Sequence, residues 1–157
     1  MKKHYFHLLV FCVAGLFSAT SFASVPLNAF ASKISLDGHF EHFVDKKSEL
    51  SFSAIAQPDF IKTHFLPLHS TRSLGYNTNA HWFRAVLNPA PDAPKRWVLV
   101  IGSAELENVD VWLGDDVRGF QYYALGYHRS YEGRPLGTRL FSIPMDVFVG
   151  TQIYLRV

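Results

Sequence analysis

The chain of 157 residues has the length of one ordinary domain, and it carries 15 Lys and Arg residues against 13 Asp and Glu residues. Residues 1–23 contain Lys2 and Lys3 but no acidic residue, so the remainder is electrically balanced before histidine is counted. This balance excludes a protein that attracts nucleic acid or an anionic membrane by its net charge. The only cysteine, Cys12, lies in the same segment, which excludes a disulfide framework and a cysteine-based metal site in the rest of the chain.

Residues 1–23 have the layout of a secretory signal peptide. The two lysines precede an apolar run over 8–17, and Ser21-Phe22-Ala23 is the small-x-small pattern that precedes a cleavage site. The run is shorter than the roughly 20 apolar residues that span a bilayer, and an uncleaved N-terminal anchor is the alternative. We therefore expect a protein exported to the periplasm, with Ser24 as the first mature residue.

The remaining chain is expected to contain a flexible lead-in over 24–32 and a single β-sandwich domain over 33–157. Short segments of β-forming residues recur about every ten residues between Gly and Pro, which is typical of an antiparallel sandwich or barrel. One short helical turn is expected over 59–63, and a polar loop over 126–139. The expected strands cover 34–36, 50–55, 80–87, 97–101, 109–113, 119–125, 140–143 and 153–157.

Three of these segments also predict which side chains share a face. The apolar run over 97–101 indicates a strand buried on both sides. In the segment 109–113, Val109, Val111 and Leu113 alternate with Asp110 and Trp112, which must point to the opposite face. The last segment alternates in the same way and the sequence stops inside it. An uncovered edge strand is a pairing hazard, so we expect the front portion of a longer protein, with the final strands of the sandwich missing.

Several stretches resemble one family of bacterial sensor domains. Leu74-Gly75-Tyr76 followed by Ala80-His81-Trp82-Phe83-Arg84 looks like a G-Y-x(4)-[YH]-W-[FL]-R signature. The segments 97–101 and 109–113 resemble the next two strands of that family, and 153–157 resembles its closing Y-L-R-V strand. The family is the second type of extracellular domain of 7TMR-DISM receptors, the seven-helix receptors with diverse intracellular signalling modules.

The resemblance covers about 34–157 and implies a periplasmic, jelly-roll-like β-sandwich that binds carbohydrate or another small ligand. In whole receptors, the domain precedes seven transmembrane helices and a cytoplasmic output module such as a histidine kinase or a diguanylate cyclase. This sequence contains neither the helices nor the module. A role in signalling is therefore implied by the resemblance alone.

Exposed aromatic rings beside Arg and Asp are what sugar recognition needs, since a ring stacks on the C–H face of a pyranose while charged groups bind its hydroxyls. Exposed aromatic and loop positions favour ligand contact. The candidates of this kind are Trp112, Tyr127, Arg129 and Arg134. A structural role is favoured for four strand residues, with an Arg84–Asp110 ion pair and a core Trp82 as the expectation. These four are Trp82, Arg84, Asp110 and Arg156.

No catalytic residue, cofactor or metal ligand is indicated. The six histidines after residue 23 form no metal-ligand pattern, and the carboxylates are typical of solvated loops. Two other classes of function stay open beside the receptor sensor. One is a free-standing secreted carbohydrate-binding or adhesion module with no signalling role, and the other is a structural domain that only mediates homodimerisation.

Overall fold

The structure, a computed structural model, describes residues 24–69 and 78–157. The predicted signal peptide and the Leu74-Gly75-Tyr76 part of the signature lie outside these ranges. None of the helices within them is long and apolar enough to cross a membrane. The elements are β1 (Val25–Leu27), β2 (Phe40–Asp45), α1 (Phe52–Ile55), α2 (Pro58–His64), β3 (Leu66–Leu68), β4 (Ala80–Pro89), β5 (Arg96–Ile101), β6 (Val109–Asp115), β7 (Gly119–Leu125), the 3-10 turn η1 (Tyr131–Gly133), β8 (Phe141–Asp146) and β9 (Thr151–Arg156).

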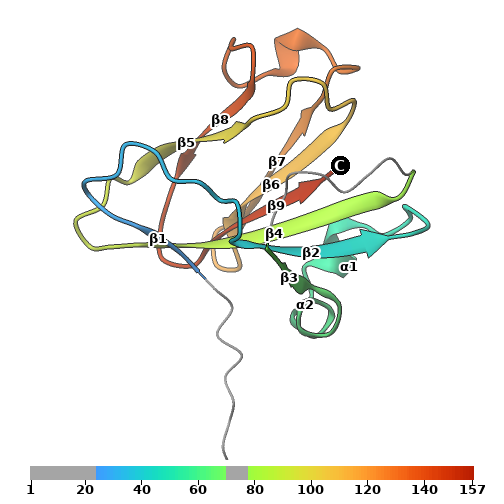
Figure 1. Cartoon of the computed structure of the whole chain (residues 1–157), viewed down its shortest axis with the longest axis horizontal. Helices are drawn as coiled ribbons and strands as arrows, with labels where there is room; N and C mark the ends of the chain where they lie inside the picture. Colours follow the sequence, from blue (N-terminus) through green and yellow to red (C-terminus); the bar gives the residue numbers. More distant parts are fainter. Residues whose placement is uncertain (1–23, 70–77) are drawn as a thin grey trace, which may run out of the picture.

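The strands form two sheets, which confirms the predicted all-β sandwich (Figure 1). The large sheet has the order β3-β2-β4-β9-β6-β7, and β1 pairs with β4 as its one parallel partner. The small sheet contains only β5 and β8, paired antiparallel. The last strand, β9, is bonded on both sides, to β4 and β6, and so lies in the middle of the large sheet rather than at an edge.

The main core fills the space between the two sheets. The side of the large sheet that faces β5 and β8 is called the inner face here. Alternation places Val109, Val111 and Leu113 of β6 on it, all buried as predicted. Leu99 of β5 and Phe141 of β8 pack against them from the small sheet. This burial of apolar surface is the main source of stability, because the described residues contain no disulfide.

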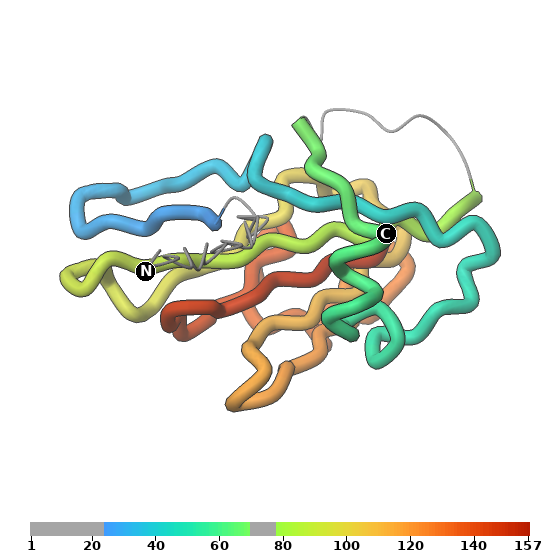
Figure 2. The backbone as a smooth tube through the Cα atoms, turned by 90° about the horizontal axis from the view of Figure 1, so that it is seen from below, coloured from blue at the N-terminus to red at the C-terminus, as the bar shows by residue number. Residues whose placement is uncertain are grey.

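The opposite side of the large sheet, the outer face, carries a second core. Trp82 and Tyr154 are almost completely buried there against Ile55, Ile61 and Phe65 from the helical segment. Figure 2 shows this segment lying across the strands of the large sheet. Alternation therefore assigned the strand faces correctly. The sequence analysis expected the outer face to be open to a ligand, but helices α1 and α2 cover its centre.

The predicted strand over 50–55 is wrong, because residues 52–55 form helix α1. The Ser51 side chain caps the helix by accepting a hydrogen bond from the Ala54 amide. One turn of helix then directs both Phe52 and Ile55 toward the outer face. The predicted helical turn at 59–63 is confirmed by α2, which begins at Pro58, a residue well suited to a first helical position.

Three further expectations differ from the structure. Val98 and Val100 are about half exposed, at 49% and 51%, because the small sheet turns its outer side to solvent; the segment 97–101 is thus not buried on both sides. Residues 34–36 form no strand, whereas Phe40–Asp45 do. The lead-in predicted as flexible contains β1, whose alternate apolar residues Val25 and Leu27 fill the inner core.

Candidate functional site

The outer face of the large sheet brings together most of the residues that the sequence singled out. Cross-strand pairing places Glu41, Arg84, Tyr154, Trp112 and Tyr122 in one row from β2 to β7. The neighbouring row contains Trp82, Arg156 and Asp110. Polar and aromatic side chains therefore lie side by side in two adjacent rows of the outer face.

Trp112 is enclosed by other rings. It stacks on Phe52 of α1 at 4.9 Å and on Trp82 at 5.3 Å between ring centroids, and it contacts Tyr122 at 5.1 Å. Two other rings thus stack on the indole, which is only partly exposed. Tyr122, at 50%, is the most exposed aromatic side chain of this cluster.

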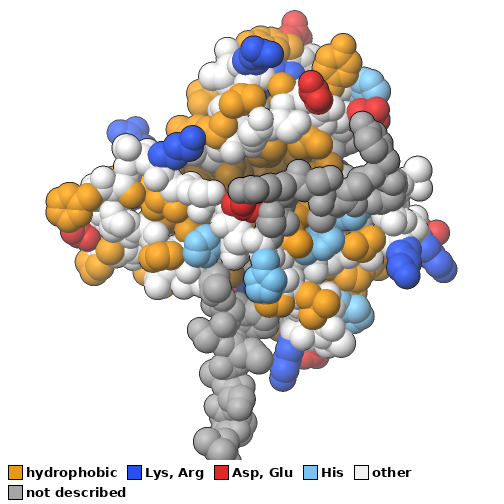
Figure 3. All heavy atoms as spheres, in the orientation of Figure 1, with side chains coloured by type: hydrophobic (Ala, Val, Ile, Leu, Met, Phe, Trp, Pro, Cys, Tyr) orange, Lys and Arg blue, Asp and Glu red, His pale blue; other side chains and the backbone are white. Residues whose placement is uncertain are grey.

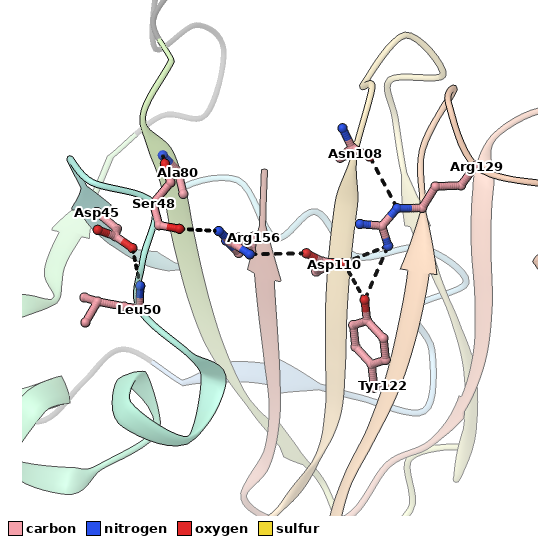
Figure 4. A network of polar contacts seen from close by, with 9 residues as sticks. All are labelled: Asp45, Ser48, Leu50, Ala80, Asn108, Asp110, Tyr122, Arg129 and Arg156. Atoms are coloured by element: carbon pink, nitrogen blue, oxygen red, sulfur yellow. Dashed lines mark hydrogen bonds and ion pairs between the residues drawn. The ribbon is translucent and has the colours of Figure 1, made fainter.

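A partly exposed polar network, the Asp110 network, borders this aromatic cluster (Figure 4). The Asp110 carboxylate forms an ion pair with the Arg129 guanidinium and accepts a hydrogen bond from the Tyr122 hydroxyl, each at 2.7 Å. Its second oxygen lies 3.7 Å from Arg156, and the Asn108 side chain accepts a longer bond from Arg129 at 3.4 Å. Two arginines and one carboxylate leave this network with one net positive charge.

Backbone geometry fixes the Arg156 side of the network. Arg156 donates to the Ser48 carbonyl at 2.9 Å, and the Ser48 hydroxyl accepts the Ala80 amide at 3.0 Å (Figure 4). Ser48 adopts a left-handed backbone with φ of 55°, in the turn that follows β2. The Asp45 carboxylate closes this turn by accepting the Leu50 amide at 2.8 Å. The guanidinium of Arg156 also lies over the Trp82 ring at 5.7 Å.

The protonation equilibria of the network are shifted in the direction that preserves it. Burial raises the pKa of the Tyr122 hydroxyl, and its hydrogen bond to Asp110 raises that pKa further. Burial alone would lower the pKa of Arg129, but the bonds to Tyr122 and Asp110 outweigh it and the pKa is raised. The tyrosine therefore stays a donor and the arginine stays charged throughout the neutral range.

A second polar network lies in the interior of the same face and is called the Arg84 network here. Arg84 forms an ion pair with Glu41 at 2.5 Å, with side-chain exposures of only 10% and 9%. Its Nε donates to the Tyr154 hydroxyl at 3.0 Å and to the Gln152 side chain at 3.1 Å. The predicted Arg84–Asp110 ion pair is therefore wrong, because the strand register places Glu41 opposite Arg84 and Arg156 opposite Asp110.

The remaining two candidate residues lie apart from both networks. Arg134 lies over the rings of Tyr131 and Phe141, each at 4.9 Å, and Phe141 belongs to the inner core. Tyr127 is 70% exposed, and its ring contact in the described structure is with the adjacent His128. The structure thus gathers Trp112, Arg129, Asp110, Arg156 and Trp82 around one region and leaves Arg134 and Tyr127 outside it.

Sequence reasoning missed four members of the two networks: Glu41, Asn108, Tyr122 and Gln152. Tyr122 carried a usable signal, since its strand 119–125 was predicted and its neighbours Gln121 and Tyr123 belong to the opposite face. Glu41 carried none, because the strand that contains it was not predicted.

Histidines form a separate feature at one end of the inner face. The side chains of His42 and His81 meet at 2.9 Å between Nε2 and Nδ1, and their rings are stacked at 5.2 Å. Burial lowers the pKa of both histidines, and the proximity of His81 lowers that of His42 further. Figure 3 shows histidine side chains gathered over β2 on the face that it views. No group of three potential metal ligands occurs within 24–69 and 78–157.

Comparison with known proteins gives one match. The family described as 7TMR-DISM extracellular 2 matches residues 37–157, which is most of the chain and the whole of the large sheet apart from β1. No curated protein and no solved structure matches the chain. The matched family therefore provides evidence on function that is independent of the geometry of the site.

Proposed function

Because the chain belongs to the 7TMR-DISM extracellular 2 family, an extracellular sensor domain of membrane receptors, we propose that it binds a carbohydrate or a similar polyhydroxylated small molecule in the periplasm. The ligand site is the Asp110 network with the exposed ring of Tyr122. Binding there is relayed to the membrane part of a full-length receptor, whose cytoplasmic output is a histidine kinase or a diguanylate cyclase.

The observation that supports this site is the partial exposure of a charged cluster beside an aromatic ring. The side chains of Arg129 and Arg156 are 28% and 30% exposed to solvent, while that of Asp110 between them is 13% exposed. One terminal nitrogen of Arg129, Nη2, has no hydrogen-bond partner among the described residues (Figure 4). The cluster therefore offers oriented donors that cost little reorganisation when a ligand arrives.

Sugar recognition requires both parts of this arrangement. The half-exposed Tyr122 ring supplies an apolar plate at the edge of the sheet, and the adjacent guanidinium and carboxylate groups supply hydrogen bonds to hydroxyls. Trp112 supports the plate from below by its contact with Tyr122, and it does not contact the ligand itself. Among the sequence candidates, Arg129 and Arg156 are the ligand-contacting residues in this proposal.

The test is binding to a glycan array followed by calorimetry, with Arg129→Gln and Arg118→Gln as a matched pair. Arg118 forms an ion pair with Asp115 at the other end of the β6–β7 hairpin, so its substitution controls for the loss of one surface arginine. We expect Arg129→Gln to lower sugar affinity at least about tenfold, which corresponds to about 1.4 kcal/mol, with Arg118→Gln unchanged. Absence of binding to every sugar, or an equal effect of both substitutions, would contradict the proposal.

Receptor function has its own test. The coding sequence downstream of codon 157 is expected to encode a membrane region of seven hydrophobic segments and an output module. A stop codon there with no hydrophobic segment would leave a free-standing carbohydrate-binding or adhesion module as the function of the same site.

A further inference from the structure

Strand β7 (Gly119–Leu125) is the last strand of the large sheet and has one unpaired side. It pairs with β6 over all seven of its residues, and no other strand of the described chain pairs with it. Its sequence, Gly-Phe-Gln-Tyr-Tyr-Ala-Leu, contains no charged residue and no proline. A long, uncharged edge strand presents unpaired amide and carbonyl groups to any strand that approaches it.

The other edges in the described structure carry features that discourage strand pairing. β1 and β3 each have three residues, with Pro26 and Pro67 at their centres. In the small sheet, β8 contains Pro144 and ends with Asp146, and β5 begins with the exposed Arg96. Proline removes an amide donor and charge resists desolvation, so both are common devices against edge-to-edge association. β7 has neither.

We propose that β7 pairs antiparallel with β7 of a second copy of this chain, which joins the two large sheets into one. The pattern of the sheet favours this partner over an unrelated strand. β7 runs antiparallel to its neighbour β6, as β6 does to β9, and a two-fold axis continues that arrangement with identical surfaces. Full overlap of the two strands places the axis at Tyr122, the central residue of the seven.

Side-chain sizes fit this register. Antiparallel pairing about Tyr122 places Phe120 opposite Ala124 of the other copy on the outer face, so a large ring faces a methyl group twice. On the inner face, Gln121 lies opposite Tyr123 of the other copy, so an amide faces a partly exposed ring. No like charges face each other within the paired segment, and aromatic cross-strand pairs stabilise such contacts.

The inner side of β7 also borders an open groove. The groove has a volume of about 240 Å³, and its lining includes Gln121, Tyr123, Met145 and Asp146. A second β7 would run along the mouth of this groove and cover its partly buried apolar side chains. The same pairing would set the two Asp110 networks on one continuous outer face, on either side of the axis, because Tyr122 belongs to both β7 and the network.

The first test is sedimentation equilibrium of the purified chain and of two glutamine-to-lysine variants. Gln121→Lys places a charge in the paired strand, about 7 Å along the strands from the same charge of the other copy, whereas Gln57→Lys places a charge on an exposed residue before α2. We expect a dimer for the native chain and for Gln57→Lys, and a loss of dimer affinity of at least about tenfold for Gln121→Lys. Equal melting temperatures of the two variants establish that both fold.

The second test fixes the register with single cysteines, since residues 24–157 contain none. A residue on the axis faces its own copy at about 5 Å between Cα atoms, within disulfide range, so Tyr122→Cys should cross-link under mild oxidation. Ala124→Cys should not, because the two copies of residue 124 lie about 14 Å apart along the strands. A chain that stays monomeric, a dimer that tolerates Gln121→Lys, or equal cross-linking by both cysteines would overturn the proposal. Pairing of β7 with a different protein would give the first of these results.

Discussion

The outer face of the large sheet holds two ion-pair networks that differ mainly in their access to water. In the Arg84 network, the arginine and the carboxylate are both about nine-tenths buried, and the contacts of Arg84 with Glu41, Gln152 and Tyr154 all join strands of the large sheet. In the Asp110 network, Arg129 comes from a loop, and more than a quarter of the side-chain surface of both arginines is exposed to solvent. We therefore infer different roles for the same chemical groups: the buried ion pair stabilises the strand register, and the exposed charges are available to the ligand that we propose.

The largest expected effect is in the buried network. Arg84→Met should lower the free energy of unfolding by about 3–5 kcal/mol, because it leaves the Glu41 carboxylate buried without its ion-pair partner. The double variant Arg84→Met with Glu41→Leu should recover a large part of this loss, since no orphan charge remains. Urea denaturation followed by tryptophan fluorescence measures both changes. A double variant no more stable than the single one would show that the ion pair itself, rather than avoidance of an orphan charge, stabilises the face.

A smaller effect is expected from removing single hydroxyls. Tyr154→Phe removes a buried hydroxyl that bonds both Arg84 and Gln152, and should cost about 1–2 kcal/mol. Tyr122→Phe removes the corresponding hydroxyl of the exposed network, where water can replace it, and should cost less than about 1 kcal/mol. Thermal or urea unfolding of the two variants side by side measures the difference. Equal losses would mean that the two networks do not differ in solvation as described.

The alkaline pH dependence of stability tests the burial of Tyr154. Burial raises the pKa of Tyr154 above its ordinary value of 10.0, so the folded chain holds this proton longer than the unfolded chain does. The corresponding stability is complete below about pH 10 and is lost as the pH rises through the raised pKa. Tyr154→Phe should therefore weaken the alkaline fall in stability, as measured by urea denaturation at a series of pH values. A fall of unchanged steepness in this variant would contradict the assigned role of burial.

Period-two alternation predicted a large part of this architecture. It assigned both faces of β4, β6 and β9, because residues at i and i+2 share a face whatever covers it. What covers the outer face was not predictable in the same way. Helix α1 spans only four residues, and the apolar residues Leu50, Phe52 and Ala54 alternate as they would in a strand. The capping hydrogen bond from the Ala54 amide to the Ser51 side chain and the packing of Phe52 and Ile55 on the sheet favour the helix.

The ion-pair partners of the charged residues could not be predicted from the sequence either. Arg84 and Glu41 are separated by 43 positions, and only the register of β2 against β4 makes them neighbours. Arg129 was predicted as a loop residue for ligand contact, yet its meeting with Asp110 depends on the path of a loop that has no periodic pattern. The residue types therefore indicated which chemical groups lie on the outer face. The strand register and the loop conformation determine which of these groups contact one another.

The smallest stability effect is expected where the functional effect should be largest. Arg129→Gln should change the free energy of unfolding by less than about 1 kcal/mol, because the Arg129–Asp110 pair is partly solvated and Arg156 still faces the carboxylate. Arg118→Gln, which breaks a pair whose arginine is 53% exposed, should lie in the same range. Urea denaturation of both variants tests this. A loss of about 3 kcal/mol or more for Arg129→Gln alone would assign Arg129 a structural role like that of Arg84. It would contradict the proposal that the Arg129 guanidinium is available to bind a ligand.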